Sequence, residues 1–132
     1  MNIRPAVRLL ILVTVPAIRF VSAETSDVAG IWRGESLCAT DAAACKNESV
    51  VYYIKDVPGH PDLVFIQADK IVNGKAITMG SGQSQYHRAQ QTLQWALPQQ
   101  VWLLKITGTR IEGTLTRADQ TVVRKMTLVK DK

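Results

Sequence analysis

The sequence is poor in the residues that build catalytic and metal centres. It holds only two histidines and two cysteines among its 132 residues. His60 stands between a glycine and a proline and His87 follows a tyrosine, and neither has a clustered carboxylate or a second histidine at metal-binding spacing. No serine stands in a Gly-x-Ser-x-Gly nucleophile elbow. Carboxylates such as Glu48 and Asp69 are unpaired in the sequence, and we expect them to be solvated. The sequence therefore predicts no enzyme, no metal site and no cofactor.

A strong excess of positive charge is also lacking once the N-terminus is set apart. Three of the 16 basic residues fall within the first 23 residues, which leaves 13 against 11 acidic residues in the rest of the chain. The two signs are interspersed there, whereas a nucleic-acid-binding chain gathers a basic stripe. We therefore exclude nucleic acid as a partner.

The N-terminus has the three parts of a secretory signal. Arg4 and Arg8 precede a mostly apolar core at residues 9–18, and Val21-Ser22-Ala23 supplies small residues for cleavage. The core is shorter than the about 20 residues that span a bilayer. We predict a signal peptide over residues 1–23 and one periplasmic or secreted domain over residues 24–132, with no transmembrane segment after leader removal. A retained N-terminal anchor is the alternative.

The only cysteines, Cys38 and Cys45, both fall in the exported part. An oxidising compartment favours a disulfide between them. A redox or metal site is the alternative, but no third cysteine or histidine lies nearby in the sequence. We predict a structural disulfide that ties down a loop at residues 39–47.

From residue 28 onward the pattern is short alternating segments separated by turn residues, without helical periodicity. Asn73-Gly74 is the strongest hairpin signal, and residues 58–62, 107–109 and 118–120 mark further turns. Consecutive hairpins predict an antiparallel up-and-down meander. Closure into a barrel removes its exposed edges, so the predicted fold class is a small all-β barrel of about eight antiparallel strands. Ser81-Gly82 is either a bulge or a turn between two strands. The candidate strands are residues 28–36, 50–57, 63–72, 76–80, 83–87, 92–97, 101–107, 111–117 and 121–130.

Arg124 is the unusual residue of the last strand, because it shares the face of Val122, Met126 and Leu128. A half-buried guanidinium needs a partner. First and last strands are neighbours in a closed barrel, so the face of Trp32 is the predicted partner. In the alternative, the opposite face is buried and Arg124 lies in solvent.

These features together resemble the calycin superfamily, which groups lipocalins, fatty-acid-binding proteins and avidins. The resemblance rests on Gly30-x-Trp32 near the start of the first strand, the eight-stranded meander and Arg124 on the last strand. It implies that Gly30, Trp32 and Arg124 close one end of the barrel, so that a binding site is expected at the other end. The chain also resembles small exported bacterial proteins of unknown function.

Aromatic residues point to binding rather than to catalysis. Tyr52, Phe65, Trp95 and Trp102 stand on four different candidate strands, and a barrel brings such positions together. A cavity that they line would suit a small apolar or amphipathic ligand. The alternative is that these rings simply fill a small barrel.

A second function is indicated by Ser81, Gly82 and Tyr86. Ser81-Gly82-Gln83-Ser84-Gln85-Tyr86 resembles the Ser-Gly-x-x-Tyr loop of small exported bacterial lysozyme inhibitors, although its spacing is one residue longer. The resemblance implies a protein partner in the cell envelope, such as a lysozyme or another hydrolase. A glycine-rich bulge explains the same residues without a partner.

Overall fold

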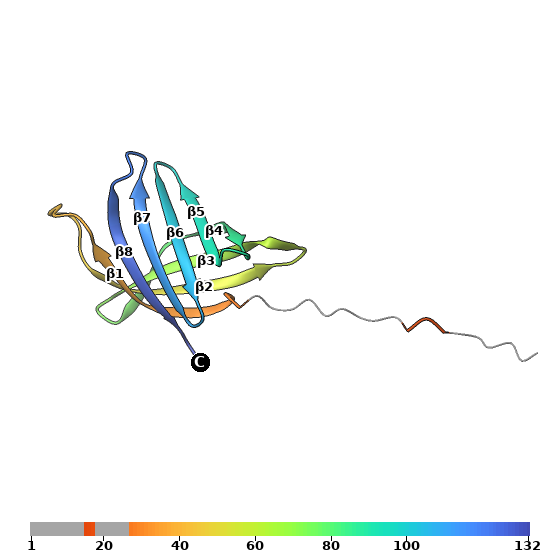
Figure 1. Ribbon diagram of the computed structural model, residues 1–132. Coiled ribbons are helices and arrows are strands. Elements are labelled where there is room, and N and C mark those ends of the chain that lie inside the picture. Colours follow the sequence, from red (N-terminus) through yellow and green to blue (C-terminus); the bar gives the residue numbers. More distant parts are fainter. Residues whose placement is uncertain (1–14, 18–26) are drawn as a thin grey trace, which may run out of the picture.

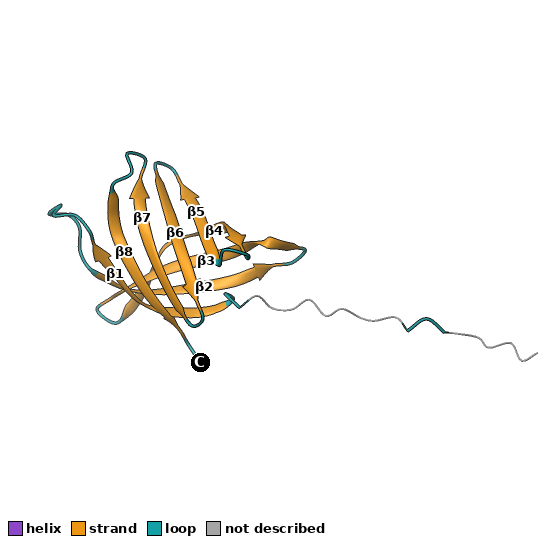
Figure 2. Cartoon of the chain, viewed as in Figure 1, coloured by secondary structure: helices purple, strands orange, loops and turns teal. Residues whose placement is uncertain are grey.

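The computed structural model describes residues 15–17 and 27–132. The predicted signal peptide and its cleavage site, apart from residues 15–17, lie outside the described residues. Over the described part, every regular element is a β-strand, and no helix there is long and apolar enough to cross a membrane. Short turns join most of the strands, and a longer loop at residues 39–47 joins the first strand to the second, as Figure 2 shows.

Eight antiparallel strands follow one another around a closed barrel, each paired with its neighbours in the sequence, and the last strand pairs with the first. This confirms the predicted meander. In Figure 1, β2 and β3 run across the view while β5 to β8 run up and down it, so the two halves of the barrel cross steeply. The strands are β1 (Gly30–Cys38), β2 (Glu48–Val57), β3 (His60–Val72), β4 (Lys75–His87), β5 (Thr92–Leu97), β6 (Gln100–Thr107), β7 (Arg110–Arg117) and β8 (Val122–Lys130).

The hairpin turns follow their local sequence. Asn73 and Gly74 have φ angles of 50° and 77°, the left-handed pair that a tight two-residue hairpin requires. The turn predicted at residues 58–62 is shorter than expected, because β3 already begins at His60. A loop without helix connects β1 to β2, as predicted for the segment between the cysteines.

Strand β4 corrects the predicted break at Ser81-Gly82. Residues 75–87 form one strand, and Gly82 pairs with Ile66 in regular register. The irregularity lies at Met79, since Ala68 pairs with Gly80 while the next residue, Asp69, pairs with Thr78. The extra residue is a bulge, which bends the strand where it leaves the barrel wall.

The antiparallel order places the connections at two ends. We call the end with the β1–β2 loop and the β3–β4, β5–β6 and β7–β8 turns the disulfide end. The opposite end, where β1 begins, is the Trp32 end. Most of the fully buried side chains of the core belong to the Trp32 end or the middle of the barrel: Val28, Trp32, Ile54, Val64, Ile66, Leu93, Leu104, Ile111, Met126 and Leu128.

Trp32 closes its end of the barrel, but its partner is Lys130 and not Arg124. The indole is 0% exposed, its Nε1 donates a 2.9 Å hydrogen bond to the Val28 carbonyl, and the Lys130 ammonium lies 5.7 Å from the ring centroid. Gly30, at φ 146°, leaves room for this lysine, because a Cβ there would approach Lys130 Cε to 2.7 Å.

The register explains why the predicted contact between Trp32 and Arg124 is wrong. Trp32 pairs with Lys130, whereas Arg124 pairs with Cys38 at the other end of β1. Six residues of extended strand separate the two positions by roughly 20 Å. Arg124 nevertheless faces inward, as the alternation indicates, with its side chain 18% exposed.

Candidate functional site

A pocket opens at the disulfide end, where β4 and β5 separate. Only three residue pairs join these strands, from Gln85 with Gln94 to His87 with Thr92, so the later part of β5 has no partner on β4. The pocket has a volume of about 180 Å³. It is lined by Ala68, Met79, Gly80, Ser81, Trp95, Leu97, Gln100 and Trp102.

Two glycines of β4 make room for the Trp95 ring. A Cβ on Gly80 would lie 3.6 Å from Trp95 Cη2, and one on Gly82 would lie 3.3 Å from Trp95 Nε1. The indole therefore lies against bare backbone, with Trp95 itself 7% exposed. A side chain at either position would compete with the ring or with the space beside it.

Tyr52 lies directly behind the pocket. It pairs with Ala68 across β2 and β3, and its ring meets that of Trp102 edge to face at 6.2 Å. The residue is 1% exposed, and its hydroxyl has no hydrogen-bond partner in the described part of the protein. Burial raises the pKa of this phenol above its ordinary value; nearby Arg124 lowers it and Glu48 raises it. The hydroxyl is therefore neutral and available as a donor.

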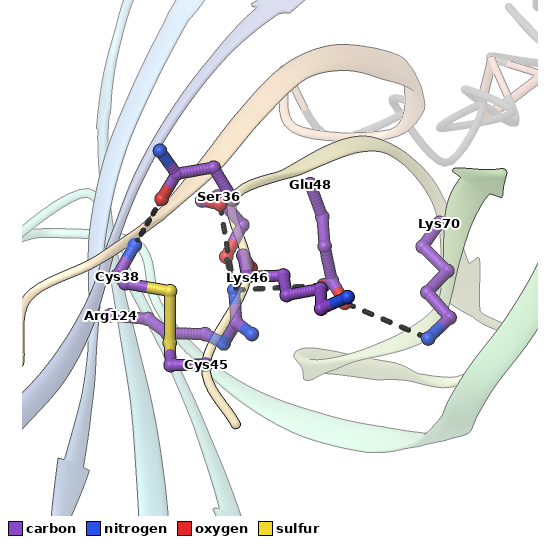
Figure 3. Close-up of a disulfide and its surroundings, with 8 residues drawn as sticks. Ser36, Cys38, Cys45, Lys46, Glu48, Lys70 and Arg124 are labelled. Carbon is purple, nitrogen blue, oxygen red and sulfur yellow. Dashed lines mark hydrogen bonds and ion pairs between the residues drawn. A yellow bond between two sulfur atoms is a disulfide. The ribbon is translucent and has the colours of Figure 1, made fainter. Parts of the chain in front are cut away.

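A charged cluster lies beside the disulfide, as Figure 3 shows. Arg124 Nη1 donates to the Lys46 carbonyl at 3.0 Å and to the Ser36 hydroxyl at 3.3 Å. It also lies 3.6 Å from Glu48 Oε2, and Glu48 Oε1 lies 3.6 Å from Lys70 Nζ. Arg124 and Glu48 are 18% and 19% exposed, so water screens these charges less than it does on an open surface.

The disulfide holds the loop that carries one of these acceptors. Cys38 and Cys45 are bonded, which confirms the predicted bridge, and the Cys38 amide donates to Asn47 Oδ1 at 2.8 Å. Lys46 follows Cys45 directly, so the bridge fixes the carbonyl that accepts from Arg124. Loop and guanidinium thus stabilise one another.

Replacing both cysteines by serine is expected to lower the free energy of unfolding by about 2.5 kcal/mol, because the unfolded chain regains the entropy of the closed loop. Urea denaturation followed by tryptophan fluorescence measures this difference. The unaltered protein under reducing conditions serves as the control and should lose a similar amount. An unchanged midpoint in both would contradict a stabilising role for the bridge.

The sequence-predicted aromatic residues do not all meet at one place. Trp95 and Trp102 line the pocket and Tyr52 lies behind it. Phe65 does not, because it points outward from β3, is 38% exposed, and borders a shallow outer hollow with Tyr53, Lys55 and Gln67. The parity of β3 explains the error: Val64, Ile66 and Ala68 alternate with Phe65 and face the interior.

The predicted partner loop at Ser81, Gly82 and Tyr86 is also corrected. All three residues belong to the continuous strand β4 and form no loop. Tyr86 is 4% exposed and faces the core, so it cannot enter a partner's cleft. Ser81 and Gly82 instead border the pocket and the Trp95 ring.

Sequence reasoning missed Ser36, Glu48 and Lys70 as interior polar residues. The alternation of residues along each strand could have identified Glu48. It lies on the same face of its strand as the buried residues Val50, Tyr52 and Ile54. Glu48 was expected in solvent and is instead paired inside the barrel mouth. Asp69, also expected in solvent, is 5% exposed and accepts a hydrogen bond from Gln67.

Within residues 15–17 and 27–132, no three His, Cys, Asp or Glu side chains come together as a metal site would require. The pocket offers an apolar wall, and the charged cluster holds two cations, Arg124 and Lys70, that share the Glu48 carboxylate. Such an arrangement can hold a small molecule by shape and charge. A scan against protein-family models finds no matching model, and searches of curated proteins and of solved structures find no match either.

Proposed function

We propose that this chain is an exported, non-catalytic binding protein that takes the apolar part of a small amphipathic ligand between β4 and β6. The observation that carries the proposal is the pocket lined by Trp95 and Trp102, which lies at the end opposite Trp32. The indoles and Leu97 supply apolar contact, and Gln100 supplies a polar rim.

The size of the pocket limits the ligand. Its about 180 Å³ falls below the roughly 300–1,000 Å³ of sites that enclose a drug-sized molecule. Most of the fully buried side chains of the core lie toward the Trp32 end and the middle of the barrel. The ligand we propose therefore places one short apolar group in the pocket and leaves its other end outside.

The closed eight-stranded meander is compatible with a lipocalin-like fold, and the disulfide fits an exported protein. We extend this to membership in the calycin superfamily and to a periplasmic or secreted location. Mass spectrometry of the exported chain tests the location. A mass that lacks residues 1–23 and two hydrogens supports it, and free thiols on an uncleaved chain contradict it.

Gly80→Leu is expected to weaken binding of 1-octanol by at least about tenfold, because the added side chain occupies the space beside Trp95. The Cβ itself fits, at an ordinary 3.6 Å from the ring. Titration with 1-octanol, followed by the fluorescence of the pocket tryptophans, measures the effect. The matched control is Ala96→Leu, which adds the same side chain at an exposed position of β5.

The titration has two informative outcomes. Saturable binding to the parent and to Ala96→Leu, with loss in Gly80→Leu, supports the proposal. Equal binding by all three proteins places the ligand elsewhere and contradicts it.

Native mass spectrometry of chain taken from its own compartment adds an independent test: a co-purifying small molecule supports a binding protein, whereas a stoichiometric protein partner favours the envelope-interaction alternative.

A further inference from the structure

One edge of β4 has no neighbouring strand over about half of its length. The pairing of β4 with β5 stops at Gln85, which stands opposite Gln94. Continued in the same register, it would bring Leu97, the last residue of β5, opposite Gly82. Residues 75–81 therefore extend past the end of β5. Within the described part of the chain, no strand pairs with them on that side.

The backbone along this edge offers hydrogen bonds to a further strand. Unpaired N–H and C=O groups of an edge strand are a template for another extended chain. Residues 76–81 carry neither a charge nor a proline, two common means of blocking an edge, and the side chains from Lys75 to Met79 are exposed. β3 holds the edge extended on both sides of the bulge, since Thr78 and Gly80 remain paired with it. The edge therefore favours a peptide backbone as its occupant.

The pocket lies beside this edge, and Met79, Gly80 and Ser81 of β4 belong to its lining. Residues directly opposite one another on neighbouring strands direct their side chains to the same face of the sheet. A Cβ on Gly80 would point toward the Trp95 ring inside the barrel. The side chain of a guest residue opposite Gly80 would therefore enter the pocket, whose volume of about 180 Å³ suits one apolar side chain.

The charge around the edge favours an acidic guest. Residues 75–97, which are β4, β5 and the turn between them, contain no Asp or Glu. Their Lys and Arg residues are Lys75, at the start of the edge, and Arg88, in the turn. Among the described residues, neither of these two forms an ion pair. A carboxylate on the guest near Lys75 would therefore meet a cation without a competing partner.

We propose, resting on the function proposed above, that the ligand of the pocket is a short extended peptide. Its backbone pairs antiparallel with residues 75–81 of β4 and so continues the line of β5. One apolar side chain opposite Gly80 fills the pocket, and a carboxylate lies near Lys75. A second copy of this chain fits the edge less well, because its own β4 would bring another Lys75 and no carboxylate.

The probe is the peptide acetyl-Thr-Leu-Thr-Thr-Thr-Glu-amide, titrated by calorimetry. We expect saturable binding, and 1-octanol should displace the peptide because both use the same pocket. Two N-methylated versions test the backbone pairing: one carries methyl groups on its second, fourth and sixth residues, the other on its first, third and fifth. Alternate N–H groups of a strand point to opposite sides, so one version should bind at least about tenfold more weakly than the other.

Lys75→Glu is expected to weaken binding of the peptide about fivefold and to leave 1-octanol binding unchanged, because it replaces an attraction by a repulsion. Lys125→Glu is the matched control, since it makes the same change at an exposed position of β8 and should leave both affinities intact. Amide hydrogen exchange followed by mass spectrometry locates the contact. The bound peptide should slow exchange over residues 75–81, whereas 1-octanol should not.

The outcomes separate the two proposals. Binding of 1-octanol without binding of the peptide overturns the peptide inference and leaves the binding function standing. Equal affinities of the two methylated peptides, or equal peptide binding by Lys75→Glu and Lys125→Glu, also overturn the inference. So does a dimer in sedimentation velocity that the peptide leaves intact, because a second copy then covers the edge. Failure of both the peptide and 1-octanol to bind overturns the proposed function itself.

Discussion

Replacing Trp32 by alanine is expected to lower the free energy of unfolding by about 3–5 kcal/mol, the range for a large buried aromatic side chain. The ring is 0% exposed and its Nε1 satisfies the Val28 carbonyl. Alanine would therefore leave a cavity and an unpaired buried acceptor at the closed end of the barrel. It would also remove the surface over which the Lys130 ammonium lies.

Urea denaturation followed by far-ultraviolet circular dichroism measures this loss without relying on tryptophan fluorescence. Trp102→Ala is the matched control, because it removes the same side chain from a half-buried position that borders the pocket. We expect it to cost less than half as much. Trp32→Phe should lie between the two, since it keeps apolar volume and loses the hydrogen bond. Equal losses for Trp32→Ala and Trp102→Ala would contradict the assignment of Trp32 as the closing residue.

The strands were predictable because their signals are local. Alternation identified the buried rows of β5, β6 and β7, and Asn73-Gly74 identified the sharpest hairpin. Gly113 lies within the alternating strand β7, and a Cβ there would collide with a methyl of Leu104. Turn residues and the alternation of apolar and polar residues can both be recognised in a single sequence.

The partner of Trp32 was not predictable, because it depends on the register between the first strand and the last. Barrel closure sets that stagger globally through the tilt of all the strands. Both Lys130 and Arg124 are cations on β8, and the register alone decides which of them reaches the indole. The resemblance to the calycin superfamily predicted that Arg124 on the last strand contacts Trp32. In the structure Lys130 of the same strand lies over the indole instead.

The charged cluster escaped prediction for a related reason. Glu48 lies at the first residue of β2, next to the loop, where a carboxylate is normally solvated. Its burial depends on Lys70 and Arg124, which reach it from β3 and β8. The two ends of the barrel therefore differ: Trp32 closes one end with its Nε1 satisfied by a nearby carbonyl, whereas the charged cluster lies at the other.

Gly34→Ala is expected to destabilise the protein by about 3 kcal/mol, because the chains of β1 and β8 approach too closely for a side chain. Gly34 pairs with Leu128, and a Cβ on it would overlap the backbone carbonyl of Thr127. A backbone carbonyl cannot move to another rotamer as a side chain can. The hydrogen-bonded pairing of β1 with β8 that closes the barrel must therefore shift.

Gly80→Ala is the matched control, since it makes the same substitution on another strand of the barrel. Its Cβ meets only Trp95, at an ordinary distance of 3.6 Å, so we expect a change within about 0.5 kcal/mol. Urea denaturation of the two variants beside the parent measures the contrast. Similar midpoints for Gly34→Ala and Gly80→Ala would show that β1 and β8 do not approach as closely as the register requires. A loss confined to Gly34→Ala would identify the seam between first and last strands as the contact on which closure depends.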